Sequence, residues 1–484
     1  MMWVAEHTSN PKIGRAFVSN ATRLVRPRSV TGNGERLVSR AGLAWLGETA
    51  DLCGLTGGLI DAFAGASWRR HHPGRTMAQV ILALADGATC LSDLAVLRNQ
   101  PGLAGPVASE PTVWRTFEAV TSAELRGIAA ARGTARQRAW AAGAGPDGEV
   151  LVIDIDATIV ATKADKQDAA PTYKRSYGHH PLLAIAGDCN EVLAGMLRAG
   201  NAGANTAEDH IVVLADAIAA LPAEWRVGHS PGDHRDDAAK DLVVRADAGG
   251  TSHWLVEECR HRNIGYSLGF AITGAVRDAI VCVDDDTWVP AVDGNGRARP
   301  GAEVAELTHW MDLGAWPEGT RVIVRRERPH PGAQLSLFDT VEGMRHTAFI
   351  TDQPGDDIAA LELFQRQRAR AENVIRDTKA CGLANLPFDC VVNNEIWMQL
   401  CFTAHDLLVW AQQISLTGPL RRATPKTLRH RLLHVAARTT PTGQRLDLDR
   451  TWPWTTTLLS ALDHLRRAFR SLTVTTPQPA QAAL

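Results

Sequence analysis

The sequence lacks any apolar run of the roughly 18 to 20 residues that a membrane span requires. Its first residues, MMWVAEHTSNPK, also lack the apolar stretch of a signal peptide. The eight cysteines are scattered and form neither a Cys-x-x-Cys pair nor a Cys/His cluster, which favours reduced, buried thiols over disulfides or a zinc site. No internal repeat is present. These absences favour a cytoplasmic protein that has no membrane partner.

The chain does have a strong segregation of charge. Its net charge of −2 is the balance of +5 over residues 1–147, −15 over residues 148–363 and +8 over residues 364–484. The first part includes a basic stretch without a clear period, residues 1–40, which predicts a partly ordered arm. An acidic middle between basic ends is compatible with solvated surface. It is also typical of a DNA-binding protein with a carboxylate-rich metal site, because phosphates bind Lys and Arg whereas divalent cations bind Asp and Glu.

The N-terminal part has helical periodicity over residues 41–140. Ser109 followed by Pro111 predicts a sharply defined helix start, with Thr112 and Arg115 near its N-terminus. Short helices of this kind are compatible with a helix-turn-helix-like DNA-binding region, in which Thr112 and Arg115 would contact DNA. A plain helical bundle is the alternative.

The middle of the chain changes to strand-like patterns. Residues 151–160, LVIDIDATIV, form an apolar run interrupted by Asp154 and Asp156, and predict a buried strand. Two more strand patterns follow, PLLAIAG and EVLAGMLRAG, then a helix, a fourth strand that ends at Asp247, and another helix. The predicted order is therefore β-β-β-α-β-α.

The two acids of the first predicted strand need a cationic neighbour. Because side chains alternate along a strand, Asp154 and Asp156 share one face. A buried carboxylate is costly unless a partner or a metal compensates its charge, and a structural salt bridge would satisfy this as well as a metal. Asp247 ends a strand, which is where the sites of α/β proteins gather.

A third acid lies in the segment QRQRARAENVIRDTK. Here Gln365, Arg368, Glu372 and Lys379 stand at relative positions 0, 3, 7 and 14. In a helix, where each residue turns by about 100°, the four side chains share one stripe about 60° wide. Three acids on two strands and a helix would hold two divalent ions, and ligands with oxygen only suit Mg²⁺ or Mn²⁺ better than Zn²⁺.

Together these residues resemble bacterial insertion-sequence transposases of the DDE class, in the group named for a Tyr-Arg-Glu-Lys signature. The resemblance is carried by LVIDIDATIV, LRAGNAGANTAEDH, VVRADAG, RARAENVIRDTKACGLANLPF and RLDLDRTWPW. It implies an α/β fold with an RNase H-like catalytic core and a β-rich insertion, an N-terminal α-helical domain and a C-terminal helical region. The predicted domains are an N-terminal helical DNA-binding region (1–147), the first part of the core (148–263), the β-rich insertion (264–355), the second part of the core (356–415) and a basic C-terminal region associated with dimerisation (416–484).

By position, the resemblance implies a catalytic and metal-binding triad of Asp156, Asp247 and Glu372, with Mg²⁺ as cofactor and Mn²⁺ as its substitute. Asp154 stays open as an alternative to Asp156. We choose Asp156 because Thr158 follows two positions later, as a Thr or Ser does after the family's aspartate.

The resemblance also implies contacts with DNA. Arg368 and Lys379 would contact phosphates. Gln365 stands where the signature has tyrosine, so it can hydrogen-bond a phosphate but cannot stack. Three weaker candidates for DNA contact are Arg198, Asn201 and Trp316. The tryptophan lies in the predicted insertion, where related enzymes stack one on a flipped base, and a core role is its alternative.

The implied function is cut-and-paste transposition. A homodimer would bind the terminal inverted repeats of its element in double-stranded DNA, cleave a phosphodiester and join the 3′-OH to target DNA. A second hypothesis is a haloacid-dehalogenase-like phosphatase with Asp154 as nucleophile and Asp156 as acid/base. It is less favoured because it gives no role to the polar stripe, and because its loop normally follows a strand near the chain's start. A third is a domesticated or decayed DNA-binding relative.

Overall fold

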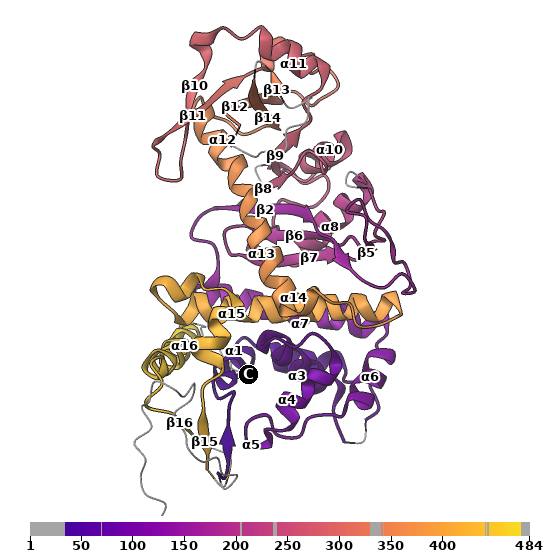
Figure 1. Cartoon of the computed structure of the whole chain (residues 1–484), viewed down its shortest axis with the longest axis vertical. Helices are drawn as coiled ribbons and strands as arrows, with labels where there is room; N and C mark the ends of the chain where they lie inside the picture. The colour runs from indigo at the N-terminus through magenta and orange to yellow at the C-terminus, as the bar shows by residue number, and fades with distance from the viewer. Residues whose placement is uncertain are drawn as a thin grey trace, which may run out of the picture.

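The computed structural model describes residues 34–475 except for positions 69, 204–205, 236–239, 330–339, 342, 441 and 443–444. The arm predicted over residues 1–40 therefore lies almost wholly outside the described residues. Figure 1 shows an elongated molecule in three tiers, with a helical body at one end, a sheet in the middle and a β-rich part at the other end.

One mixed sheet of ten strands runs through the two upper tiers. Its order is β10-β11-β12-β14-β9-β8-β2-β6-β7, with β13 paired to β14 beside this path. The strands nearest the β7 edge are β2 (Val150–Ala157), β6 (Leu182–Ala186), β7 (Glu191–Met196), β8 (Asp241–Ala246) and β9 (Gly265–Phe270). β6 pairs antiparallel with β2 and β7, whereas β8 pairs parallel with β2 and β9. Read from β7 to β9, and with the five strands numbered by their order in the chain, the arrangement is 3-2-1-4-5, which is that of an RNase H-like core.

The core is held by apolar burial around β2. Residues 151–155 of this strand are all buried, so both of its faces are covered. Helix α8 (Ala207–Ala219) packs against β6 and β7, and α10 (His253–His261) packs beside α8 and against β9. A strand covered on both faces has a near-continuous apolar run, which is why LVIDIDATIV was readable from the sequence.

The β-rich part continues the same sheet. It contains β10 (Val289–Val292), β11 (Ala298–Glu306), β12 (Arg321–Glu327), β13 (Thr340–Val341), β14 (Met344–Thr351) and the helix α11 (Gly274–Val281). The insertion predicted over residues 264–355 includes the segment GYSLGF. The structure assigns it to the core as β9, because it pairs in parallel with β8 and only then antiparallel with β14. Partner choice of this kind depends on contacts distant in the chain.

Two smaller features border the core. Three short strands, β3 (Val160–Ala161), β4 (Ala170–Pro171) and β5 (Tyr177–His179), form a separate sheet in the order β3-β5-β4, which we call the side sheet. The predicted helix around the polar stripe is present as α12 (Ile358–Arg366), a 3-10 segment (Gln367–Arg370) and α13 (Ala371–Thr378). Figure 1 shows this helical run passing from the β-rich part down to the helical body.

The helical body is built from both ends of the chain. Its N-terminal helices are α1 (Leu43–Leu52), α2 (Leu55–Ala62), α3 (Pro73–Asp86), α4 (Ala95–Arg98), α5 (Pro101–Ala104), α6 (Glu110–Glu118) and α7 (Ser122–Ala139). Its C-terminal helices are α14 (Val391–Ser415), α15 (Pro425–Leu428) and α16 (Thr455–Thr475). The short α9 (Ala223–Arg226) follows α8. Helix α14 packs against α1, α3, α7 and α16.

A small sheet also joins the two ends of the chain. β1 (Leu37–Val38) pairs antiparallel with β15 (Ala437–Thr439), which pairs with β16 (Leu446–Leu448). The regions separated in the sequence as residues 1–147 and 416–484 thus share one body in space.

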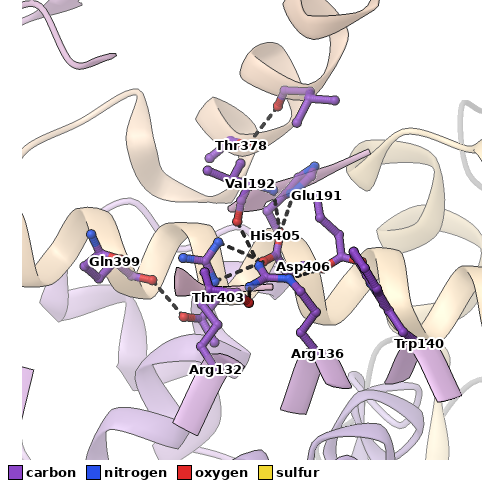
Figure 2. Close-up of polar contacts among 12 residues, drawn as sticks. Arg132, Arg136, Trp140, Glu191, Val192, Thr378, Gln399, Thr403, His405 and Asp406 are labelled. Atoms are coloured by element: carbon purple, nitrogen blue, oxygen red, sulfur yellow. Dashed lines mark hydrogen bonds and ion pairs between the residues drawn. The ribbon is translucent and has the colours of Figure 1, made fainter. Parts of the chain in front are cut away.

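A buried network of charges connects this body to the core, as Figure 2 shows. On α7, Arg132 and Arg136 lie 2.8 and 2.9 Å from Asp406 of α14. Arg136 also pairs with Glu191 of β7 at 2.8 Å, and the indole of Trp140 donates to the same glutamate at 2.6 Å. Three elements that are distant in the sequence are therefore joined by buried charges.

No single helix among the described residues is long and apolar enough to cross a membrane. One helix pair, Pro73–Asp86 with Leu91–Arg98, passes the length and composition test jointly but is bent by 98°.

Candidate active site

The ends of two parallel strands bring two acids to one edge of the core sheet. Asp156 lies one residue from the end of β2, and Asp247 directly follows β8. Ile155 and Ala246 are register partners in the parallel ladder between these strands. The residues that follow them, Asp156 and Asp247, therefore leave the sheet at the same edge.

A cavity of about 670 Å³ lies at this edge. Its walls include both of these acids and, from the helical run, Arg368, Glu372 and Lys379. Glu372 stands in the first turn of α13 and is exposed, as is Asp247. The structure thus brings together the three predicted acids and two of the predicted phosphate contacts.

The charges in the cavity are unevenly compensated. Burial raises the pKa of Asp156 above its ordinary value; Arg368 opposes this rise and Asp247 adds to it. The Nη1 atom of Arg368 lies 3.2 Å from the Asp156 carboxylate. Asp156 therefore has one cationic partner, Arg368, and one anionic neighbour, Asp247, at the end of β2.

Lys379 is the last residue of the polar stripe and directly follows α13. Its ammonium donates to the carbonyl of Ile159 at 2.8 Å. Burial lowers the pKa of Lys379, and the nearby charge of Lys174 lowers it further. Cations from different elements thus converge on the cavity that holds the acids, as a site for a polyanion requires.

Asp154 has entirely different surroundings from Asp156. It is fully buried and receives a bidentate pair of bonds from Arg245, at 2.7 Å from Nε and 2.8 Å from Nη2. Burial raises the pKa of Asp154, an effect that Arg245 opposes. The phosphatase hypothesis is not supported, because it needs Asp154 as an exposed nucleophile.

Comparison with known proteins identifies the family. Residues 23–470 match the family model described as Transposase DDE domain group 1. The chain belongs to this family. It is a DDE transposase, an enzyme that cleaves and transfers DNA strands.

Other comparisons add little detail. A solved structure similar to this transposase is a piggyBac transposase seen by cryo-EM in a synaptic complex with hairpin DNA. The two share 10% sequence identity and a TM-score of 0.38, over 93% of this chain and 88% of that chain. No curated protein matches the transposase.

Gln365 lies apart from the other three residues of the stripe. Its amide accepts from the hydroxyl of Ser267 at 2.9 Å and donates to the carbonyl of Ala246 at 3.1 Å, so both ends are engaged with the strands β9 and β8. The 3-10 segment contributes to this. It turns each residue by about 120° instead of about 100° and lies between Gln365 and Glu372, so these two side chains no longer share the line that a continuous α-helix would give them. The predicted phosphate contact is thus a link between helix and sheet in this structure.

Arg198 is also placed differently from the prediction. It is buried, and its guanidinium donates to the carbonyl of His180 at 3.0 Å and pairs with Asp209 at 3.0 Å. It therefore supports the backbone around the side sheet, and its contact with DNA stays a prediction. Asn201, in the same motif, is exposed, and its contact with DNA stays a prediction.

Trp316 has one ring face covered by a neighbouring ring. The ring stacks on His253 with 3.8 Å between ring centroids and meets Phe270 edge-on at 5.7 Å. This favours the packing role over base stacking. The other two candidates, Thr112 and Arg115, lie on α6 within hydrogen-bond distance of each other, and their contact with DNA stays a prediction.

DDE transposases generally use divalent metal ions. Asp156, Asp247 and Glu372 offer only oxygen atoms, which suits a hard cation such as Mg²⁺. In the ranges that the structure covers, however, no group of three or more His, Cys, Asp or Glu side chains is arranged to hold a metal ion. The donor chemistry therefore fits Mg²⁺ or Mn²⁺, but binding requires Arg368 to leave Asp156 and the three carboxylates to draw together.

Sequence reasoning missed several residues that line the cavity: Tyr173, Lys174, His180, His210 and Arg376. Burial lowers the pKa of both histidines, so they favour the neutral form. The run TYKRS, with an aromatic residue next to two cations between two strand patterns, is a local signal that could have identified part of this set.

Proposed function

We propose that this transposase cleaves and joins DNA at the cavity between β2, β8 and α13. It binds the terminal inverted repeats of its own insertion sequence, pairs two ends as a homodimer and moves the element by cut-and-paste. Asp156, Asp247 and Glu372 form the catalytic triad, and Arg368 and Lys379 hold phosphates of the bound strand. We also place the enzyme in the Tyr-Arg-Glu-Lys signature group and in the bacterial cytoplasm, where its DNA substrate lies.

One observation supports this proposal most strongly. A single cavity is lined by an acid beside the end of β2, an acid after β8, an acid on α13 and two cations of the same helical run. A solvated helix face would account for Arg368 and Lys379 alone. It does not account for their meeting Asp156 and Asp247 at the edge of an RNase H-like sheet.

Each residue has a distinct task in the reaction. The carboxylates would hold two divalent ions, which supply positive charge to activate the attacking water or 3′-OH and to stabilise the leaving oxygen. Arg368 neutralises Asp156 in the free enzyme and is near enough to move to a phosphate when DNA arrives. Lys379, fixed by the Ile159 carbonyl, positions the strand further along the helix.

The proposal is tested by cleavage of a labelled duplex that carries the inverted repeat flanking the gene. With Mg²⁺ present, wild-type protein should nick the end and then join it to target DNA. Glu372→Gln should bind the same duplex but lose at least about 1,000-fold in cleavage rate, since it removes a ligand that acts in the transition state.

The matched control is Asp377→Asn on the same helix. Asp377 pairs with Arg376 at 3.1 Å and does not line the cavity, so this variant should cut at nearly the wild-type rate. Cleavage by Glu372→Gln at the wild-type rate would remove the assignment of the site.

A further inference from the structure

The side sheet carries a short, tightly closed turn at the cavity. The turn runs from Thr172 to Ser176, and we call it the tip turn. The amide of Thr172 donates to the carbonyl of Ser176 at 2.7 Å, and their hydroxyls lie 2.8 Å apart. Arg175 has a φ of 59°, in the left-handed region that a residue with a side chain seldom adopts. The turn is therefore closed by specific bonds in one conformation.

The tip turn presents an aromatic ring and a cation to the cavity. Tyr173 and Lys174 both line the cavity that holds the three acids. Tyr173 is 75% exposed, so most of its ring is accessible from the cavity side and from solvent. Its neighbours are the ring of His180, edge-on at 6.1 Å between centroids, and the ammonium of Lys174, which lies over one face at 5.6 Å from the ring centroid. Because the side chain is largely exposed, it keeps ring surface on which a base can stack, and Lys174 already lies beside that ring.

The positive charge of the tip turn lacks a partner carboxylate among the described residues. Within the part of the chain that the structure describes, neither Lys174 nor Arg175 forms an ion pair with an acid. Lys174 is close enough to Lys379 for its charge to affect that residue, although the two cations repel each other. Like charges that converge without a carboxylate between them are stabilised by phosphates of bound nucleic acid.

The turn is held in place from two sides. On one side, Gly200 of the LRAGN motif passes so close that a Cβ there would lie 2.3 Å from the Gly178 carbonyl and 2.4 Å from that of Ala170. On the other side, the amide of Gln167 donates to the carbonyl of Asp389 at 3.0 Å, just ahead of α14. This anchoring gives LRAGN a physical role, since its backbone fits against the side sheet only as glycine.

We propose that the tip turn is a DNA-binding element of the active site, in which Tyr173 stacks on a base beside the scissile phosphate and Lys174 binds the adjoining phosphate. Base stacking on an exposed ring is tolerant of sequence, because every base offers a π-face. The turn therefore holds any terminal strand in line with the acids. This inference rests on the proposed function of the cavity.

The test places 2-aminopurine, one position at a time, beside the cleavage site of the inverted-repeat duplex. The full-length protein is bound in Ca²⁺, which prevents cleavage, and fluorescence is read for each variant. The parent and Tyr173→Phe should give the same signal at one position, because both keep the ring. Tyr173→Ala should lose that signal and slow cleavage in Mg²⁺ by about tenfold or more.

Tyr177→Ala is the matched control. Tyr177 lies on β5 of the same side sheet and is 49% exposed, but it does not line the cavity. This variant should behave as the parent does. Lys174→Gln should lower the slope of log affinity against log salt by about one, whereas Lys174→Arg should keep it.

The outcomes separate this inference from the proposed function. If the parent cuts, Glu372→Gln does not, and Tyr173→Ala matches the parent in both fluorescence and rate, then only the role of the tip turn is wrong. If the parent neither binds nor cuts the duplex, the proposed function itself fails. Equal effects of Tyr173→Ala and Tyr177→Ala would also overturn the inference, since they would indicate a general loss of the side sheet.

Discussion

Asp154 and Asp156 stand two residues apart on one face of β2, yet the fold gives them opposite tasks. Asp154 is closed off by Arg245 deep in the sheet, and Asp156 reaches the cavity. The sequence predicted that a cation must lie near this pair of acids. It left open whether that cation was an arginine or a metal, because the partner, Arg245, lies on another strand. The structure supplies an arginine to both acids, Arg245 to the first and Arg368 to the second.

Removal of one partner from the buried pair should be costly. Arg245→Ala leaves the carboxylate of Asp154 buried without compensation, so the free energy of unfolding should fall by about 3–5 kcal/mol. The double variant Asp154→Leu/Arg245→Met removes both charges and should recover most of this loss. Urea denaturation followed by tryptophan fluorescence measures both. A loss below about 1 kcal/mol in Arg245→Ala would contradict the account.

At the scale of elements, the helix that carries Glu372 is fixed to the sheet next to Asp247. Gln365 bonds Ala246, the residue before Asp247, and Ser267 on the neighbouring strand. Arg245 reaches the same helix through the carbonyl of Phe364. The separation of the second and third acids is therefore set by polar contacts made about two helical turns before Glu372 and next to Asp247.

Gln365 should accordingly act on rate more than on binding. Gln365→Leu breaks both contacts and should slow cleavage by about tenfold to 100-fold, because a shift of about 1 Å in a catalytic group has effects of this size. Affinity for the inverted repeat should change little. Ser267→Ala combined with Gln365→Leu should be less than additive, since the two residues share a bond.

Gln367→Leu is the control for this helical segment. Among the residues that the structure describes, the side chain of Gln367 has no hydrogen-bond partner. It should cut as the wild type does. If Gln365→Leu weakened end binding in parallel with cleavage, Gln365 would be a direct DNA contact, as the sequence first suggested.

The side sheet should be sensitive to pH. His179 is fully buried, its Nε2 lies 3.1 Å from the Gln167 carbonyl, and its Nδ1 has no hydrogen-bond partner in the structure as described. Burial lowers the pKa of His179 in the folded state, so the unfolded state binds the proton more tightly. Stability from this group is present above the unfolded pKa of about 6.5 and is lost as pH falls through the folded value.

The melting temperature should therefore decrease between pH 7.5 and pH 5.5, and His179→Gln should decrease less over the same range. Differential scanning calorimetry at matched ionic strength measures the two slopes. Identical slopes would mean that His179 does not titrate on unfolding in this range.

Element types were largely predictable because their periods are local. The spacing of apolar residues predicted the strand at LVIDIDATIV and the helix around Glu372. In the structure these apolar residues are the buried ones of β2 and α13. Pairing was less predictable. GYSLGF joined the core as β9, and Gln365 bonds to β8 and β9 instead of facing the cavity, because partners distant in the chain decide strand order and side-chain contacts.

At the scale of the molecule, the buried charge network holds the helical body and the core in one arrangement. Asp406 takes part in contacts with both Arg132 and Arg136, while Glu191 anchors the network in β7. The active-site cavity lies at the ends of β2 and β8, and this network holds β7, the border strand that lies two strands from β2 in the same sheet. No sequence pattern predicted the buried charge network, because its members are single residues on three separate elements.

Breaking the network should destabilise the whole chain. Asp406→Asn leaves two buried guanidinium groups short of an anion and should lower the free energy of unfolding by about 3–5 kcal/mol. Asp463→Asn is the control, since Asp463 pairs with Arg467 at the surface and should matter by no more than about 0.5 kcal/mol. Limited proteolysis should cut Asp406→Asn faster than wild type, and equal rates in all three proteins would contradict the role of the network.

The measurement that tests the central claim most directly is metal rescue of thiol variants. In Asp156→Cys, Asp247→Cys and Glu372→Cys a thiolate replaces one carboxylate, and Mn²⁺ accepts such a ligand more readily than the harder Mg²⁺. If these residues hold the catalytic metal ions, all three variants should bind the inverted repeat, fail to cut it in Mg²⁺ and regain cleavage in Mn²⁺. Asp377→Cys should cut in both metals. Absence of rescue in all three variants, or full activity in Mg²⁺ in any of them, would contradict the assignment of the active site.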